Sequence, residues 1–263
     1  RPGPPHKWFD PAAHALISSI EAAVGRYDIV HFHGLGPALF AWVPRLTGRR
    51  VVTTLHGLDW QRRKWGPVGR GVLRLAEGVA AYSSHAVVVV SRDLRGYWLR
   101  KHGAGAIHLP NAPHGVRRRS AVQIKDAYGL EAGKFVLFLG RLVPEKRVEW
   151  LIEAFKRLLA SGEKRFAELR LVIAGEPDYS EGYARRLKKW ATDGRIVFAG
   201  EVAGRLRDEL LSQARLFVLP SSMEGMPIAM LEANPTTKVP LAAVKSVMVL
   251  ALPALRPETQ TSW

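Results

Sequence analysis

Short runs of β-branched and aliphatic residues alternate along the chain with longer segments in which apolar residues recur at helical spacing. The short runs end in Gly, Ser or Pro, and each is followed by one of the longer segments. This alternation is typical of buried parallel strands that are joined by helices. The pattern therefore predicts an α/β fold.

The first half of the chain contains one set of these elements, and the second half repeats it. Strands are predicted at 29–32, 51–55, 86–90 and 107–109, then at 135–139, 169–174, 196–198 and 216–219. Helices are predicted near 11–24, 69–84 and 93–101, then near 148–160, 181–190 and 205–214. Each half is predicted to form a Rossmann-like layer.

Between the halves the periodicity stops in a segment that contains PNAPHGVRRRS. Pro, Asn, Gly and a run of charges interrupt regular structure as a linker does. We expect an N-terminal domain over 1–118, a linker over 119–130 and a C-terminal domain over 131–233.

Composition limits the class of protein. A chain of 263 residues with 47% hydrophobic residues can bury two modest cores. The net charge of +16 predicts attraction to phosphates, to acidic lipid surfaces or to nucleic acid. The chain has no Cys, which fits a reducing compartment, and we expect a cytoplasmic protein. The apolar run 239–255 is short and interrupted for a membrane span.

Two cations follow the first strand of the second half. Ligands of open parallel sheets bind outside the carboxyl ends of the strands. There the motif GRLVPEK places Arg141 and Lys146 in the loop and first turn of the next helix. Cations are unfavourable at that end of a helix dipole, so an anion between them would explain the arrangement. The alternative is two solvated cations with Glu145 as partner.

Two carboxylates follow the strand 216–219, in the motif PSSMEGMPIAMLEA. Gly225, Met226 and Pro227 open a predicted helix whose free amides would bind a phosphate. Glu224 precedes this helix and Glu232 lies within it, at a spacing that suits different partners, such as the hydroxyls of a transferred sugar and of a ribose. The alternative is one Glu near a helix cap and one exposed helical Glu.

The joint order of these motifs resembles the donor-binding domain of family 4 glycosyltransferases of the GT-B fold, over residues 135–233. The hallmark of that family, two Glu separated by seven residues, is met by Glu224 and Glu232. The Arg and Lys pair that precedes them is met by Arg141 and Lys146. The resemblance implies two Rossmann-like domains whose parallel sheets face a cleft.

The resemblance also implies roles for single residues. Arg141 and Lys146 would neutralise the donor diphosphate, Glu224 would contact the donor sugar, and Glu232 would hold the ribose. The donor-binding residues implied in this way are Gly140, Arg141, Lys146, Gly200, Val202, Gly225, Met226, Pro227 and Glu232. Gly200 and Val202 match the loop where the family cradles the base. The family needs no metal or other cofactor.

Three histidines gather at strand ends in the first half, within HFHGLGP and HGLDW. His31 and His33 point to the same face of one strand, and His56 follows the next strand. Such a pair can bind zinc in a metal hydrolase, but that function needs further ligands on later strands, which the sequence does not offer. A His-ligated hydrolase remains the minor alternative.

The segment from DIVHFHG to TTLHGLDW also resembles the acceptor domain of the same family, in particular of bacterial and archaeal members in polysaccharide assembly. His56 matches a histidine that reaches the reacting sugar, so it and Glu224 are the expected catalytic residues. The acceptor-side candidates are His31, His33, Gly34 and Asp59. The family transfers a sugar from a nucleotide sugar to a glycan or lipid-linked acceptor and retains the anomeric configuration.

The segment 59–66, DWQRRKWG, interleaves Trp60 and Trp65 with basic residues. It could bind an anionic membrane surface at the inner face of a membrane, stack on a sugar acceptor, or form a solvated loop. The other basic residues are scattered over several helices without a recognition motif, so we expect no specific nucleic-acid partner.

Both ends depart from the family. A strand and a Gly-rich loop normally precede the position of Arg1, so we expect a chain truncated at both ends. Residues 234–263 contain no Gly and one acidic residue, Glu258, which suggests an atypical tail from a frameshift or a foreign sequence. The alternative function is therefore an inactive remnant that still binds a nucleotide sugar.

Overall fold

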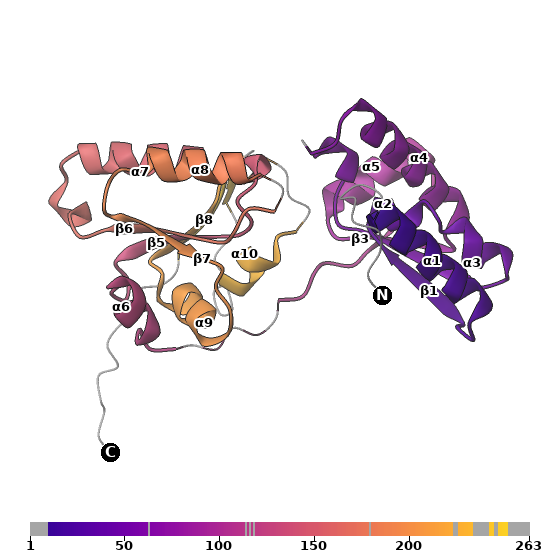
Figure 1. Cartoon of the computed structure of the whole chain (residues 1–263), viewed down its shortest axis with the longest axis horizontal. Helices are drawn as coiled ribbons and strands as arrows, with labels where there is room; N and C mark the ends of the chain where they lie inside the picture. The colour runs from indigo at the N-terminus through magenta and orange to yellow at the C-terminus, as the bar shows by residue number, and fades with distance from the viewer. Residues whose placement is uncertain are drawn as a thin grey trace, which may run out of the picture. The chain divides into compact units, whose positions relative to one another are not determined.

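A computed structural model of the chain describes residues 10–62, 64–113, 115, 117, 119–178, 180–222, 226–233, 242–244 and 247–251. The chain divides after Asn111 into two α/β units, each with its own sheet and its own core (Figure 1).

The first unit has a four-stranded parallel sheet in the order β1-β2-β3-β4. Its strands are β1 (Ile29–His33), β2 (Arg50–Leu55), β3 (Ala86–Val89) and β4 (Ile107–His108). All four strands that the sequence predicts in this half are confirmed. Burial alternates along β1, where Phe32 enters the core while His31 and His33 stay on the exposed face.

The long helices of the first unit agree with the predictions. They are α1 (Asp10–Val24), α2 (Leu35–Ala38), α3 (Trp42–Leu46), α4 (Pro67–Ser83) and α5 (Arg92–His102), with a 3-10 turn η1 (Asp59–Gln61). Ser91 caps α5 by accepting from the Leu94 amide, and Gly103 ends it in the left-handed region. The short helices α2 and α3 were not predicted, because four or five residues show no period.

The second unit has a six-stranded sheet in the order β7-β6-β5-β8-β10-β9. Its parallel strands are β5 (Phe135–Leu139), β6 (Arg170–Ala174), β7 (Ile196–Gly200) and β8 (Leu216–Leu219), as predicted. The unpredicted β9 (Ala242–Val244) and β10 (Val247–Ala251) add an antiparallel edge to β8. The rest of the expected tail, 234–263, lies outside the described residues.

Helices cover both faces of this second sheet. α7 (Val148–Ala160) and α8 (Glu181–Trp190) lie on one face, and α6 (Gln123–Tyr128), α9 (Gly204–Gln213) and α10 (Ile228–Ala233) lie on the other (Figure 1). Two 3-10 turns, η2 (Pro144–Lys146) and η3 (Lys164–Phe166), complete the unit.

The segment 119–130, expected as a linker, contains α6. Ile124 of this helix is fully buried in the second core, and so is Leu130 at 1% exposure. The buried Glu209 of α9 accepts the amides of Val122 and Ile124 at 3.0 and 3.2 Å, which caps the start of α6 from a distant helix. This segment therefore packs as part of the second unit.

Candidate functional site

The loops after β5, β6 and β7 are hydrogen-bonded to one another at the carboxyl edge of the second sheet. The Leu142 amide donates to the Glu176 carbonyl at 2.9 Å, and the Gly175 amide donates to the Gly200 carbonyl at 2.7 Å. Gly175 has φ +134°, and a Cβ there would lie 2.0 Å from the Gly140 oxygen. Only glycine fits this approach, which holds the three loops as one rim.

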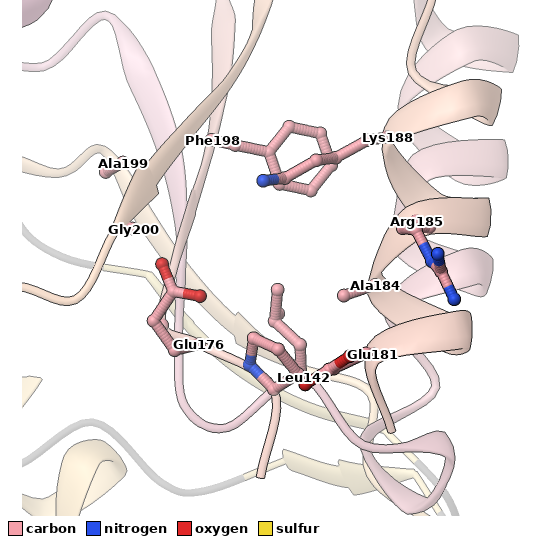
Figure 2. A pocket seen from close by; sticks show the side chains of 11 residues that line it. Leu142, Glu176, Glu181, Ala184, Arg185, Lys188, Phe198, Ala199 and Gly200 are labelled. Carbon is pink, nitrogen blue, oxygen red and sulfur yellow. The ribbon is translucent and has the colours of Figure 1, made fainter. Parts of the chain in front are cut away.

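A cavity of about 440 Å³ opens at this rim. Its lining, shown in Figure 2, is Leu142, Gly175, Glu176, Pro177, Glu181, Ala184, Arg185, Lys188, Phe198, Ala199 and Gly200. The Lys188 ammonium lies 6.0 Å from the centre of the Phe198 ring, and the Glu176 carboxylate enters from the opposite wall (Figure 2). Apolar walls with a few polar groups are typical of a small-molecule site.

The two predicted cations lie in the chain that follows β5. The Arg141 guanidinium pairs with the Asp178 carboxylate of the next loop at 2.5 Å, and both side chains are about half exposed. Lys146 ends η2, just before α7 rather than in its first turn as predicted, and its stem passes Gly140. The loop after β5 therefore offers positive charge, part of which Asp178 neutralises.

The loop after β8 contacts the same turn. The amide and the hydroxyl of Ser222 donate to the Glu145 carbonyl at 2.9 and 3.1 Å. Met226 and Pro227 lead into α10, and the Pro227 carbonyl accepts the Met230 and Leu231 amides. α10 thus begins one residue after the predicted start. The predicted Glu224 and Gly225 lie outside the described residues.

Glu232 is on α10 and its side chain is almost fully buried, at 4% exposure. Its carboxylate forms an ion pair with Arg207 of α9. A buried carboxylate needs such a partner, which also fixes its direction. Arg207 was not predicted, because it belongs to another helix and shares no motif with Glu232.

The predicted base loop follows β7. Gly200 ends the strand with φ +68° and lines the cavity. The Val202 side chain, at 9% exposure, belongs to the hydrophobic core, so contacts of this residue with a ligand would use its backbone.

The first unit brings its three predicted histidines together. The ring centroids of His31 and His33 are 4.2 Å apart, and those of His33 and His56 are 5.5 Å apart. His33 Nδ1 lies 3.2 Å from His56 Nε2, and His31 Nε2 lies 2.7 Å from the Thr54 hydroxyl. Partial burial, and then the charge of neighbouring histidines, lowers the pKa values of His31 and His56. Both rings therefore favour the neutral form near pH 7.

Asp59 connects the loops after β1 and β2. Its carboxylate accepts the Leu35 amide at 3.2 Å and pairs with Arg62 at 3.1 Å. The preceding Gly34, at φ +84°, donates its amide to the Thr54 carbonyl at 2.8 Å. The predicted acceptor-side residues thus lie close together at the carboxyl edge of the first sheet, joined by hydrogen bonds and ring contacts.

Metal-ligating side chains do not gather in the part of the chain that the structure describes, where no group of three or more His, Cys, Asp and Glu could hold an ion. Within the same residues, no helix is long and apolar enough to cross a membrane.

Two Rossmann-like units with these strand-end sites define the class of the protein as the GT-B fold. Sucrose-phosphate synthase from Thermosynechococcus elongatus shares this fold at a TM-score of 0.68 and 19% identity, over 88% of this chain and 60% of that chain. The model for "Glycosyltransferase Family 4" matches residues 1–117, and the model for "Glycosyl transferases group 1" matches residues 123–248. The chain belongs to the family 4 glycosyltransferases.

Two curated relatives illustrate this family. The GDP-mannose-dependent alpha-(1-6)-phosphatidylinositol monomannoside mannosyltransferase of Mycolicibacterium smegmatis is 28% identical over 88% of this chain and 62% of its own length. The alpha-D-kanosaminyltransferase of Streptomyces kanamyceticus is 30% identical over 81% of this chain and 58% of its own length. The chain thus spans about three fifths of the relatives it matches.

Proposed function

We propose that this protein transfers a sugar from a nucleotide-diphosphate sugar to a glycan or lipid-linked acceptor, and that the second unit binds the donor. The observation that carries this proposal is the cavity at the rim of β5, β6 and β7, beside the cations Arg141 and Lys146. A cavity of that kind accepts a nucleoside, and the adjacent cations accept a diphosphate.

We expect the donor to bind Arg141 and Glu232, which form ion pairs with Asp178 and Arg207 in the structure. A diphosphate oxygen replaces Asp178 at the Arg141 guanidinium, and Lys146 provides a second cation. Glu232, held by Arg207, accepts hydrogen bonds from the ribose hydroxyls. The backbone at Gly200 and Val202 contacts the base. Glu224 is expected to contact the donor sugar.

In the proposed reaction the bond between the anomeric carbon and the diphosphate oxygen breaks, and a bond to the acceptor oxygen forms with retention of configuration. The acceptor proton passes to the leaving diphosphate. Arg141 and Lys146 stabilise the charge that develops on this group, as a metal ion does in other enzymes, and we propose that no metal is needed. His56, favoured as a neutral ring, is proposed to hydrogen-bond a sugar hydroxyl.

Nucleotide binding by the whole chain tests the donor site. UDP and GDP are first screened by thermal shift, and the better one is titrated by calorimetry. Arg141→Met and Lys146→Met should each weaken binding by about 1.5 to 3 kcal/mol, since each removes a charge-assisted contact. Arg157→Met is the matched control, because Arg157 is an exposed cation of α7 paired with Glu153. Affinity that stays unchanged in both site variants would overturn the donor site.

A transfer assay separates an enzyme from a binding remnant. Proton spectra of the product report the anomeric configuration, and the rate in the presence of a chelator reports the need for a metal. Nucleotide binding without transfer would favour the remnant. A rate that falls with a chelator would contradict metal independence.

We also propose that the first unit contacts an anionic membrane surface, as suits a lipid-linked acceptor. The structure changes the residues that support this hypothesis. Trp60 and Trp65 pack against the first core, whereas α4 carries an exposed apolar stripe of Val68, Val72, Leu75 and Tyr82. Leu75→Glu should lower binding to anionic phospholipid vesicles, and Leu99→Glu on α5 should not. Equal binding of both variants to the vesicles would contradict a role of this apolar stripe in membrane contact.

A further inference from the structure

A single carboxylate in the first unit accepts four hydrogen bonds. Glu77 of α4 is fully buried. One of its oxygens accepts from Trp60 Nε1 and Lys101 Nζ, each at 2.9 Å, and the other accepts from the Tyr97 hydroxyl and His102 Nε2, each at 3.0 Å. The four acceptor positions of a carboxylate are thereby filled.

This group is held in its ionised form. Burial alone would raise the pKa of the Glu77 carboxyl, but the hydrogen bonds from His102, Lys101 and Tyr97 outweigh burial and lower that pKa. A fully paired carboxylate rarely stabilises a core more than a well-packed apolar side chain of the same volume does. Its contribution is directional, because it fixes the positions of the groups that donate to it.

The four donors come from two places. Tyr97, Lys101 and His102 belong to α5. Trp60 belongs to η1, the turn that follows β2 and His56. The Trp60 ring also lies 4.8 Å beneath the Arg74 guanidinium and 5.8 Å from the Lys101 ammonium. The carboxylate therefore connects α4 and α5 to the loop after β2, which carries His56.

Trp60 is adjacent to Asp59, whose carboxylate accepts the Leu35 amide from the loop after β1. A shift of the η1 backbone at Trp60 would move Asp59 along with it and would change the distance between the Asp59 carboxylate and the Leu35 amide. A continuous path of hydrogen bonds and one peptide bond thus runs from α5 through Glu77, Trp60 and Asp59 to the start of α2.

From this path we infer that Glu77 is a positioning residue, which holds the loop of residues 56–62 through Trp60 and so sets the place of His56 and Asp59. The link from loop position to turnover rests on the function proposed above. The anchoring of the loop through Trp60 does not depend on that function.

Two variants of the full chain distinguish the hydrogen bond between Trp60 and Glu77 from the other hydrogen bonds of Glu77. Trp60→Phe keeps an aromatic ring but removes the donor that connects Glu77 to the loop. Tyr97→Phe removes one neutral donor from the same carboxylate but leaves the loop attached. Each loses one hydrogen bond to Glu77, but Trp60→Phe also loses ring contact with the first core and with Arg74, so it should lower global stability more than Tyr97→Phe does.

The first measurement is hydrogen exchange, resolved to the amide of Leu35 and to residues 56–62. Trp60→Phe should speed exchange there by about five- to tenfold, the factor for one lost hydrogen bond, while α5 is unchanged. Tyr97→Phe should leave residues 56–62 as they are. Equal exchange of this loop in both variants would overturn the inference whether or not the protein transfers sugar.

The second measurement is transfer kinetics with nucleotide affinity measured alongside. Trp60→Phe should lower kcat by about the same factor with little change in nucleotide affinity, and Tyr97→Phe should change neither. An unchanged kcat in an active Trp60→Phe protein would overturn the positioning role. If wild-type nucleotide binding fails, the proposed function fails instead, and the exchange result still decides the anchoring.

Discussion

The two sheets present their candidate groups in different electrostatic states. At the edge of the second sheet the groups are charged and paired, as in Arg141 with Asp178 and Glu232 with Arg207. At the edge of the first sheet the three histidines lie against one another, and the lowered pKa values of His31 and His56 favour the neutral form of these two rings. A diphosphate can replace a carboxylate at a cation, whereas a neutral ring can exchange hydrogen bonds with a sugar hydroxyl. The difference supports the proposal that the second sheet binds the donor and the first sheet binds the acceptor.

The loops also differ in how closely they pack. A Cβ on Gly175 of the second unit would lie 2.0 Å from a backbone oxygen, whereas a Cβ on Gly34 of the first would meet the Asp59 carboxylate at 3.4 Å. At Gly175 the rim of the second sheet therefore has no room for an added atom. The edge of the first sheet has room for one, although the backbone at Gly34 is still left-handed.

The largest effect is expected at this rim. Gly175→Ala should lower the free energy of unfolding of the second unit by about 2 to 4 kcal/mol, because it combines a backbone clash with an unfavourable φ. Denaturant titration measures this. Gly194→Ala is the control, since a Cβ there meets nothing within 4 Å, and it should change stability by less than about 0.5 kcal/mol. Similar losses in both variants would show that the rim is not tightly packed.

A gain in stability is expected next to the donor cations. Arg147 has φ +51° and is the one residue other than glycine with positive φ among those that the structure describes. Arg147→Gly should raise the free energy of unfolding by about 1 kcal/mol, after the loss of its weak contact with Glu149. Arg157→Gly, in the regular helix α7, should lower it by about 1 kcal/mol. A change of the same sign in the free energy of unfolding of both variants would contradict backbone strain at Arg147.

A smaller change tests the internal partner of the donor site. Asp178→Asn removes the carboxylate that competes for Arg141, so calorimetry should show nucleotide-diphosphate affinity that rises about two- to fivefold. Asp193→Asn is the control, because Asp193 pairs with Arg195 away from the rim. Weaker binding after Asp178→Asn would mean that Asp178 orients Arg141 for the ligand rather than competing with it.

The smallest effect is expected from pH on the first unit. The pKa values of His31 and His56 are lowered, so the unfolded chain binds more protons than the folded one just below pH 6.5. Stability that is complete above this pH should decline as pH falls through the lowered pKa values, and the partly exposed rings keep the decline modest. His56→Gln should make this decline in stability smaller. Proton signals of the His31 and His56 rings that titrate above pH 6.5 would contradict the prediction.

Much of the fold could be predicted from local pattern. The eight predicted strands and the six long helices follow from runs and periods that each lie within one segment. Helix α6 was missed inside a presumed linker, because its capping carboxylate, Glu209, comes from α9. The antiparallel strand β10 was missed because its pairing with β8 depends on a partner strand elsewhere in the chain.

The site shows the same division. Sequence alone placed Arg141 and Lys146 after a strand, Glu232 in the helix that follows another strand, and the three histidines within or just after strands, because a strand and the segment that follows it are continuous in the chain. Only the tertiary structure decided their partners. Other loops and helices bring Asp178 to Arg141, Arg207 to Glu232 and Glu77 to Trp60, and no spacing along the chain encodes such contacts. Charge state and direction, on which the chemistry depends, are set by those partners and by burial.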